Sequence, residues 1–305
     1  MKIVVPPIKC QGIKTKLVPL IKRSVSLPVE GTWIEPFCGS CVVALNVQPA
    51  RALLTDSNKH IIAFYLAIQS GRINAGLVKR FLECEGSKLA QGGEKHYKEV
   101  RARFNETQDP LDFLFLNRSC FNGVMRFNQR GKFNVPFCHK PERFSQAYIT
   151  KIANQVEAVR QVVSLKQWRF EVADFRQTLS QAKGHDFVYV DPPYAGRHVD
   201  YFNSWNATDE SDLVEMLKKL PTRFLLSTWH SNKYRSNSAI SNSWTAPGFY
   251  VKTWEHFYHV GATEDLRNSM TEALIANYNF SEVADASEEK PQIPYALAEQ
   301  LRFEM

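Results

Sequence analysis

The stretch IEPFCGSCVVALN, residues 34–46, joins a short apolar segment to the start of an apolar helix through a turn that contains Pro36 and Gly39. Glycine lets backbone approach a ligand closely in such strand–turn–helix units, which are typical of nucleotide sites in α/β proteins. Cys41 stands where a small residue is usual, and it completes a Cys-x-x-Cys pair with Cys38. The stretch therefore predicts either a cofactor loop or a cysteine-based metal or redox site.

The segments that follow extend this unit into an alternating α/β fold. Residues 51–55, RALLT, predict a strand that ends at Asp56, and residues 58–68 have the apolar spacing of a helix that stops at Gly71. An acid about 20 residues beyond a glycine turn is where a nucleotide ribose is commonly held. Strand and helix patterns resume after residue 165, so the sheet is predicted in two parts with an insertion between them.

The distribution of charge indicates a polyanionic partner for the first half of the chain. The net charge is +7, with 14 basic and 8 acidic side chains in residues 70–150 and 8 against 3 in residues 1–69. Lysine and arginine bound to phosphates release condensed counterions, so this excess suits nucleic acid, and a solvated basic face is the plain alternative. The insertion predicts polar helices with a loop at residues 85–95, then a hairpin that turns at Arg130-Gly131.

Composition bounds the class of protein. Hydrophobic residues make up 44% of the 305 residues, and we find no apolar run of the roughly 18 residues that a membrane helix needs. The opening MKIVVPPIKCQG is too short and too interrupted by proline for a signal peptide, and six scattered cysteines do not resemble a disulfide framework. We therefore expect a cytoplasmic protein with no membrane association.

The stretch VYVDPPY, residues 188–194, is the most specific signal for chemistry. An apolar strand brings a carboxylate, two rigid prolines and an aromatic ring to its carboxyl end, where open α/β sheets bind ligands. Asp191 and the fixed carbonyl of Pro192 would accept the hydrogens of an exocyclic amino group, which frees the nitrogen lone pair for attack on an electrophile. Tyr194 supplies a face for base stacking. Such a transfer depends on positioning and needs no metal and no covalent protein intermediate.

Several segments together resemble the Dam-like (D12-class, alpha-group) DNA adenine-N6 methyltransferases. They are EPFCGSCVVALN, LTDSNKHIIAFY, LNRSCFNGVMRFNQRGKFNVPF, VADF, DPPY and LRNSMTEALIANY, in the family's order. The resemblance implies an α/β fold with a Rossmann-like, S-adenosylmethionine-dependent methyltransferase sheet formed by residues 1–69 and 151–280. It also implies a mainly helical plus β-hairpin target-recognition domain at residues 70–150, and leaves an acidic tail at 281–305.

The resemblance implies site-specific methylation of an adenine that is flipped out of double-stranded DNA, with S-adenosylmethionine as methyl donor. We expect the modification enzyme of a restriction-modification system, working as a monomer. A cognate restriction endonuclease would act on the same site without forming a stable complex with it. The loop after DPPY is unlike that of plain Dam enzymes, so GATC is not assumed as the target.

Residue roles carry over from the family motifs onto this sequence. The catalytic residues implied are Asp191, Pro192, Pro193 and Tyr194. The cofactor-binding residues implied are Cys10, Lys14, Glu35, Phe37, Gly39, Asp56, Asp174, Phe175 and Asp191, with Asp56 on the ribose and Asp174 and Phe175 on the adenine. The DNA-binding residues implied are Lys9, Arg118, Asn122, Arg126, Asn128, Arg130 and Arg197.

The amino-terminal motif departs from the family pattern. Residues 9–14 read Lys-Cys-Gln-Gly-Ile-Lys, where the family has a sequence close to Lys-Trp-Ala-Gly-Gly-Lys, so an aromatic residue and one glycine are lost. Both lysines remain. We expect Ile13 and Cys41 to narrow the cofactor pocket and weaken cofactor affinity.

Three alternatives stay open at this point. Asp-Pro-Pro-Tyr motifs also activate planar amines in methyltransferases that act on RNA or protein amides. A non-catalytic DNA-binding subunit would keep the fold without the transfer. A zinc or redox protein built on Cys38 and Cys41 would need further ligands, because structural zinc is usually four-coordinate.

Overall fold

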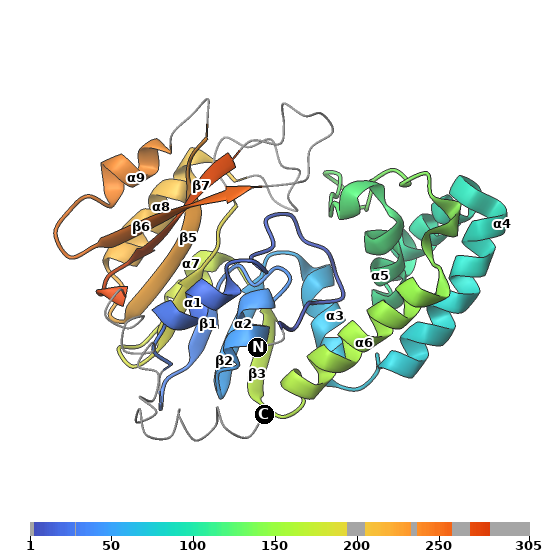
Figure 1. Cartoon of the computed structure of the whole chain (residues 1–305), viewed down its shortest axis with the longest axis horizontal. Helices are drawn as coiled ribbons and strands as arrows, with labels where there is room; N and C mark the ends of the chain where they lie inside the picture. Colours follow the sequence, from blue (N-terminus) through green and yellow to red (C-terminus); the bar gives the residue numbers. More distant parts are fainter. Residues whose placement is uncertain (1–2, 28, 194–204, 233–236, 258–268, 281–305) are drawn as a thin grey trace, which may run out of the picture.

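A seven-stranded sheet forms the centre of the protein. The computed structural model describes residues 3–27, 29–193, 205–232, 237–257 and 269–280, and its sheet has the strand order β3-β2-β1-β4-β5-β7-β6 (Figure 1). Strands β1 to β5 run parallel to one another, whereas β7 is antiparallel to both β5 and β6. The predicted Rossmann-like sheet is confirmed. The strands are β1 (Trp33–Glu35), β2 (Arg51–Asp56), β3 (Gln167–Val172), β4 (Phe187–Val190), β5 (Arg223–Asn232), β6 (Tyr250–Phe257) and β7 (Ser269–Ala276).

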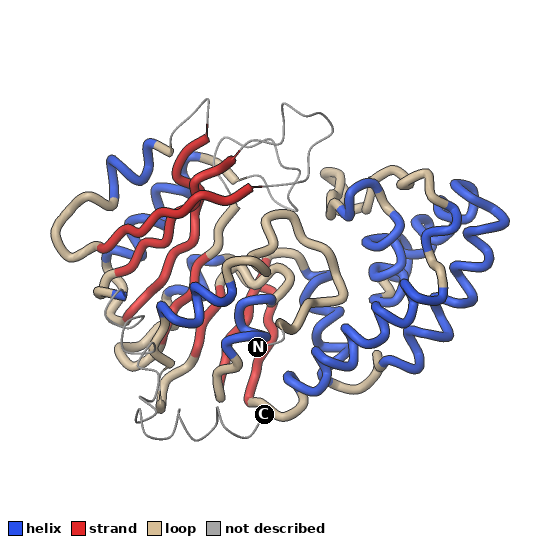
Figure 2. Tube along the Cα trace, in the orientation of Figure 1, coloured by secondary structure: helices blue, strands red, loops and turns tan. Residues whose placement is uncertain are grey.

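Helices cover both faces of this sheet, so that each strand contributes alternate side chains to two cores. Trp33 of β1 lies in the core beneath α1 (Val18–Ser24), α2 (Val42–Val47) and α3 (Lys59–Gln69). Its neighbour Ile34 lies in the opposite core, beneath α7 (Phe175–Leu179), α8 (Ala207–Lys218) and α9 (Ser238–Ser243). Figure 2 shows the strands between these two helical layers.

The central strands are held together by aromatic side chains as well as by the backbone ladder. The Trp33 ring stacks on Phe187 with centroids 5.1 Å apart and lies 6.0 Å from Tyr189. These rings come from neighbouring strands and share one face of the sheet, the arrangement in which cross-strand pairs stabilise a sheet. Strand β1 is only three residues long, and all three are buried. Side-chain packing therefore holds β1 in place more than its short ladder of backbone hydrogen bonds does.

The insertion forms a second, helical lobe beside the sheet (Figure 1). It contains α4 (Ala75–Thr107), α5 (Pro110–Ser119), the short 3-10 turns η1 (Phe121–Gly123) and η2 (Pro141–Arg143), and the start of α6 (Gln146–Val163). The expected domain boundary at residue 150 falls inside α6, which begins in this lobe and ends just before β3. Within the described ranges, no helix has the length and apolarity needed to span a membrane.

The prediction of a loop at residues 85–95 is wrong. Helix α4 continues through this segment and departs from helical geometry only at Gly93, where φ is 53° and ψ is −131°. The polar, glycine-containing sequence lacks strong helix propensity, but it is packed against α5 and α6. Gly86 shows the effect most clearly, because the Phe144 side chain occupies the space that a Cβ at this position would need. Tertiary packing therefore overrides local preference here.

The predicted hairpin is present as a narrow antiparallel loop. Isolated bridges join Phe127 to Phe133 and Cys120 to Phe137. The amide of Asn128 donates to the Lys132 carbonyl at 2.9 Å, and Gly131 adopts the positive φ of 69° that closes the turn. Alternate apolar residues of this loop are buried in the helical lobe, which anchors it there.

Gly86 gives a test of this packing. A Cβ at Gly86 would lie 2.7 Å from the Phe144 Cβ, so Gly86→Ala should lower the free energy of unfolding by about 1–3 kcal/mol despite the better helix propensity of alanine. Gly76→Ala, in the first turn of α4, is the matched control. Its Cβ would meet only ordinary contacts at 3.5 and 3.6 Å, so it should be neutral or stabilising by up to about 1 kcal/mol. Urea unfolding of both variants measures the difference, and equal stabilities would contradict the close contact.

Candidate active site

The candidate site lies where the strand order reverses, between β1 and β4. The carboxyl ends of β1, β2 and β4 meet at one edge of the sheet, and they present Glu35, Asp56 and Asp191 respectively. Ligands of open α/β sheets bind outside the carboxyl ends of the strands at such a switch point. The fold thus brings together three acids that are separated by up to 156 residues in the sequence.

The loop after β1 is fastened to the acid at the end of β2. The amide of Gly39 donates to Asp56 Oδ2 at 2.9 Å, and the amide of Asn58 donates to Oδ1 at 2.8 Å. Burial raises the pKa of Asp56, and these two backbone donors oppose that rise. A carboxylate has about four lone-pair positions, so each oxygen can still accept another donor. Gly39, at φ 47°, has open space where a Cβ would stand. These features fit a bound diol such as a ribose.

Cys38 and Cys41 lie inside this loop. Cys41 has a left-handed backbone, with φ 56°, a conformation that glycine adopts more readily than cysteine. Both thiols are buried, and burial raises the pKa of each above its ordinary value, so both hold their protons. Zinc and redox sites use thiolates. Across the ranges that the structure describes, no three His, Cys, Asp or Glu side chains are grouped so as to hold a metal ion.

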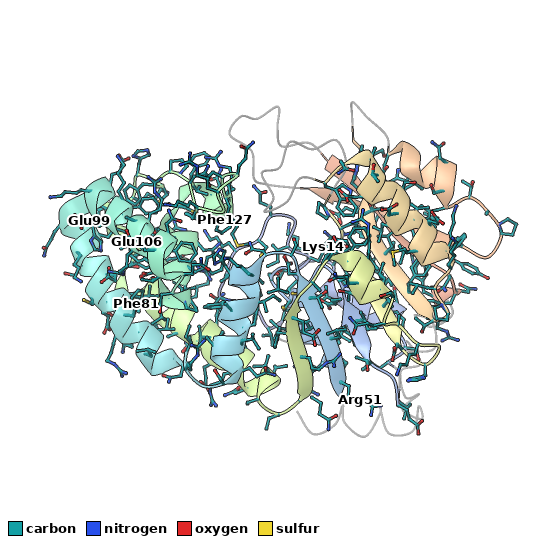
Figure 3. All side chains as sticks on the ribbon, turned by 180° about the vertical axis from the view of Figure 1, so that it is seen from behind. Lys14, Arg51, Phe81, Glu99, Glu106 and Phe127 are labelled. Atoms are coloured by element: carbon teal, nitrogen blue, oxygen red, sulfur yellow. The ribbon has the colours of Figure 1, made fainter. Side chains whose placement is uncertain are left out.

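Asp191 is paired with a lysine from the amino-terminal segment. Lys14 Nζ lies 2.8 Å from Asp191 Oδ1 and donates a second hydrogen bond to the Gly12 carbonyl at 3.0 Å. Lys14 is 2% exposed, and Figure 3 shows it at the ends of the central strands of the sheet. Burial raises the pKa of Asp191 to about 6, although Lys14 lowers it, and the nearby Glu272 adds to the rise. The carboxylate is therefore charged at neutral pH, with Oδ1 fixed by the ammonium.

Glu35 is the most deeply buried acid of the group. Its carboxyl is 2% exposed and accepts a 2.8 Å hydrogen bond from Trp33 Nε1. Burial raises the pKa of Glu35 to about 8, more than this hydrogen bond lowers it, and Asp191 contributes to the rise. At neutral pH Glu35 is mostly protonated. It can therefore donate a hydrogen bond as well as accept one.

An aromatic cluster lies next to these acids. The rings of Phe37 and Phe175 stack with centroids 5.3 Å apart, and Trp205 meets them at 5.5 and 5.4 Å. The carboxylate of Asp174 accepts from the Arg176 amide and thereby caps α7, which fixes Phe175 beside it. The predicted adenine-binding pair is thus on the same edge as Asp56. Strand β3, which precedes it, pairs with β2 throughout its length.

The amino-terminal segment also reaches the helical lobe. The Asn117 side chain of α5 accepts from the Lys9 amide at 2.7 Å, donates to the Lys9 carbonyl at 2.9 Å and contacts the Gly123 carbonyl at 3.4 Å. Cys10 follows directly, and its burial beside Asp56, Cys41 and Asp191 raises the pKa of its thiol. A single segment therefore contacts the loop of residues 120–137 through Lys9 and the Asp191 carboxylate through Lys14.

The proposed DNA-binding residues fall into two groups. Arg118 is 5% exposed and donates to the Pro7 carbonyl, the Tyr148 hydroxyl and Gln155. Its guanidinium therefore joins the amino-terminal segment to α6 within the protein. The Asn128 side chain accepts from the amides of Arg130 and Lys132 and shapes the turn.

Other residues of the group are directed outward. Asn122, at φ 52°, and Arg130 are exposed, and Phe121 beside Asn122 is 52% exposed. The partly buried Arg126 donates to the Asn134 side chain at 2.9 Å. Its neighbour Phe127 lies on the part of the helical lobe that carries this loop (Figure 3). Tyr194 and Arg197 lie outside the described residues.

Two residues of the site were missed from the sequence. Asn117 is fully buried and directly follows the apolar run FLFL, residues 113–116, and an amide at the end of such a run is a signal that it has fixed polar partners. Glu272, in the middle of β7, is also fully buried and acts on the pKa of Asp191. A single acid within the apolar strand TEALIA carries the same kind of signal.

The sheet order and the acids at its switch point define an α/β enzyme site for a nucleotide-containing cofactor. The chain belongs to the D12 class N6 adenine-specific DNA methyltransferases, whose family model matches residues 11–260. Membership implies S-adenosylmethionine as the methyl donor.

Relatives of the chain include enzymes of two kinds. The chain is 27% identical to the type II methyltransferase M.FokI of Planomicrobium okeanokoites over 286 residues, which are 89% of this chain and 42% of that protein. It is 30% identical to a DNA adenine methylase of Vibrio cholerae over 224 residues, 70% of this chain and 75% of that one. It is 26% identical to the modification methylase StsI of Streptococcus sanguinis over 91% of this chain and 43% of that protein. The chain thus spans less than half the length of M.FokI and StsI.

The Lys14–Asp191 pair predicts a pH dependence. Protonation of Asp191 would turn one of its acceptor oxygens into a donor, so methylation should fall as pH drops through about 6. Lys14→Met removes the charge that lowers this pKa, so the acid limb of the kcat/KM profile should move to higher pH. Lys16→Met, which changes an exposed lysine of the same segment, should leave the profile in place. An unchanged acid limb in Lys14→Met would contradict the pairing.

Glu35 predicts a second pH effect, on stability. Its folded pKa of about 8 exceeds the unfolded value of about 4.3, so its contribution is complete below the unfolded value and is lost as pH rises towards 8. Glu35→Gln keeps an acceptor for Trp33 and cannot ionise. Its free energy of unfolding relative to the wild type should therefore increase from pH 5 to pH 8, by at most about 1.4 kcal/mol per pH unit. Glu30→Gln, at an exposed site, is the control, and a pH-independent difference for Glu35→Gln would exclude the buried proton.

Proposed function

We propose that this chain transfers a methyl group from S-adenosylmethionine to the N6 amino group of an adenine flipped out of duplex DNA. The observation that carries the proposal is the buried Lys14–Asp191 contact at the carboxyl end of β4, followed directly by Pro192 and Pro193. It supplies a fixed acceptor beside a rigid carbonyl, at the edge of the sheet where a ligand would bind. Membership of the adenine-specific family supports adenine as the base.

The chemical role of Asp191 follows from its contacts. Lys14 occupies Oδ1, which leaves the other oxygen to accept one hydrogen of the adenine amino group. The Pro192 carbonyl would accept the other, and its direction is fixed because proline fixes φ. Two acceptors on the same nitrogen draw it towards a tetrahedral geometry and localise its lone pair for attack on the methyl carbon. Fixed dipoles of this kind need no reorganisation during the reaction. Tyr194 would stack on the base.

The loop and strand ends fit the methyl donor, which supplies an electrophilic methyl group when bound. Asp56 has free lone pairs for two ribose hydroxyls, and Gly39 leaves room beside it. Phe37, Phe175 and Asp174 would bind the adenine of the donor. Glu35, Cys10 and Lys14 would lie along its amino-acid end. The protonated Glu35 can donate a hydrogen bond there without adding a charge.

The loop of residues 120–137 in the helical lobe, here named the recognition loop, is proposed to bind the DNA around the target. Asn122 and Arg130 are exposed on it, and Arg126 is partly exposed, so their side chains can reach base edges or phosphates. Lys9 lies against the same loop at Gly123. The buried Arg118 would support this region through its hydrogen bonds to the Pro7 carbonyl and Gln155. Arg197 would add a contact from the loop after Tyr194.

A place in a restriction-modification system is the biological setting that the relatives favour. M.FokI is described as a type II methyltransferase and StsI as a modification methylase. Methylation alone would then prevent cleavage by an endonuclease that recognises the same site. Base-resolved sequencing of DNA from cells that express this chain gives the methylated site. Purified chain with a labelled methyl donor should label duplex DNA and not total RNA, whereas label in RNA alone would overturn the proposal.

Asp191→Asn tests the catalytic role directly. Asparagine keeps the shape of the side chain and loses the charge, and its amide presents hydrogens where acceptors are needed. Methylation of duplex DNA should fall by roughly 10²–10³-fold or more, since one preorganised group is removed from the reacting atom. Cofactor affinity, measured by calorimetry, should change little.

Glu215→Gln is a suitable control because Glu215 is exposed on α8 and paired with Lys219, away from the proposed site. Substantial methylation by Asp191→Asn would refute the assigned role. Loss of cofactor binding together with activity would instead make Asp191 a cofactor residue.

A further inference from the structure

Three basic side chains gather around one tyrosine at the junction of the amino-terminal segment and the helical lobe. Arg118 Nη1 and Arg143 Nη2 both donate to the Tyr148 hydroxyl at 3.2 Å. The two guanidinium carbons lie 5.7 and 4.9 Å from the centroid of the same ring. Lys9 is close enough for its charge to act on Tyr148, and the positive charges of Arg118, Lys9 and Arg143 together lower the pKa of that hydroxyl although burial opposes this.

No carboxylate of the described residues is paired with this basic cluster, because Lys9, Arg118 and Arg143 form no ion pair there. The charged or polar groups that act on the Lys9 ammonium are Tyr148, Arg143, Arg118 and Cys120, and those that act on the Arg118 guanidinium are Tyr148 and Arg143. Gathering like charges at a partly buried site is unfavourable unless a group of opposite charge offsets it. The chain does not provide that group from its described residues.

The hydrogen bonds of Tyr148 indicate where an anion would bind. Its hydroxyl oxygen accepts from both arginines, and no described residue accepts its own proton. Arg118 uses all three of its nitrogens, on the Pro7 carbonyl, the Tyr148 hydroxyl and Gln155. Among the described residues, the hydrogen bonds of Arg143 come from Nε and Nη2 alone. The Tyr148 O–H, Arg143 Nη1 and the Lys9 ammonium are therefore donors that remain available at one place.

We infer that Lys9, Arg143 and the Tyr148 hydroxyl form a binding site for one backbone phosphate of the DNA substrate, with the buried Arg118 holding its geometry. Charge-assisted hydrogen bonds from arginine and lysine, together with a hydroxyl donor, suit a phosphodiester oxygen. This inference rests on the proposed function, because duplex DNA is the polyanion that this enzyme would bind.

The position of the cluster favours DNA over a free phosphate. Lys9 packs on Gly123 of the recognition loop, where a Cβ would lie 2.5 Å from its Cδ. The same segment continues to Lys14 and the catalytic Asp191. A phosphate bound at Tyr148 would therefore belong to the strand that passes between the recognition loop and the active site. Its contribution would be to register and affinity, and not to the choice of base.

The test is DNA affinity as a function of salt. Arg143→Gln should weaken binding of a duplex that contains the methylated sequence by roughly tenfold, and should reduce the slope of log K against log salt by about 0.9. Unrelated duplexes should lose affinity by a similar factor. Tyr148→Phe keeps the ring beneath both guanidinium groups and should weaken binding with no change in slope, because no charge is lost.

Arg160→Gln is the matched control on α6. It changes the net charge by the same amount, but Arg160 is already paired with Glu157, so affinity and slope should stay at wild-type values. Thermal unfolding and cofactor affinity of every variant exclude misfolding. A series of duplexes with one neutral methylphosphonate linkage each then locates the phosphate. One linkage should weaken wild-type binding and have no further effect on Arg143→Gln.

The outcomes separate the two proposals. Wild-type affinity and slope in Arg143→Gln, or a loss confined to one base sequence, would overturn the phosphate site while methylation by the wild-type chain upholds the function. Additive effects of Arg143→Gln and every neutral linkage would also overturn it. A wild-type chain that neither binds nor methylates duplex DNA would overturn both. Inhibition by inorganic phosphate at millimolar concentrations in the wild type alone would indicate a free-phosphate site and overturn the DNA assignment.

Discussion

The buried ion pair between Lys14 and Asp191 is the contact on which the site depends. It joins the amino-terminal segment to the carboxyl end of β4, and both groups are largely removed from water. Removing one partner of such a pair leaves a buried charge and costs about 3–5 kcal/mol. The pair therefore does two things with one contact. It lowers the pKa of Asp191 against the effect of burial, so that the carboxylate is charged at neutral pH, and it fixes one carboxylate oxygen.

The same segment links the carboxyl-terminal edge of the sheet to the helical lobe. Asn117 binds both the amide and the carbonyl of Lys9, five residues before Lys14, and also contacts Gly123 of the proposed recognition loop. A short, hydrogen-bonded stretch of chain therefore runs from that loop to the Asp191 carboxylate. The basic cluster around Tyr148, which we infer to be a phosphate site, includes Lys9 of this stretch. Under the proposed function, DNA recognition and methyl transfer would share this one segment, although they belong to separate lobes.

Much of the fold and part of the site could be predicted from local patterns. The glycine turn, the helix at α3 and the strand before Asp191 were recognisable because hydrophobic periodicity marks the elements and glycine or proline residues mark their ends. Helix α4 was not fully predicted, because its polar middle is held by contacts with α5, α6 and Phe144 that no local pattern records. Arg118 looked like a surface residue from its type. Only the packed structure shows that its guanidinium is used internally, since its partners are 30, 37 and 111 residues away.

The sequence by itself indicated the class of chemistry, because a carboxylate followed by two prolines at the end of an apolar strand is a local motif that can be recognised from consecutive residues. It also determined the two-part sheet and the basic insertion, which follow from periodicity and charge. Tertiary structure alone decided which charges meet. It set Lys14 against Asp191, raised the pKa of Glu35 by burial, and gathered Lys9, Arg118 and Arg143 around Tyr148. The energy of a charge pair depends on the distance between its groups, and the cost of desolvation depends on their burial. Distance and burial are properties of the folded chain and cannot be deduced from the order of residues.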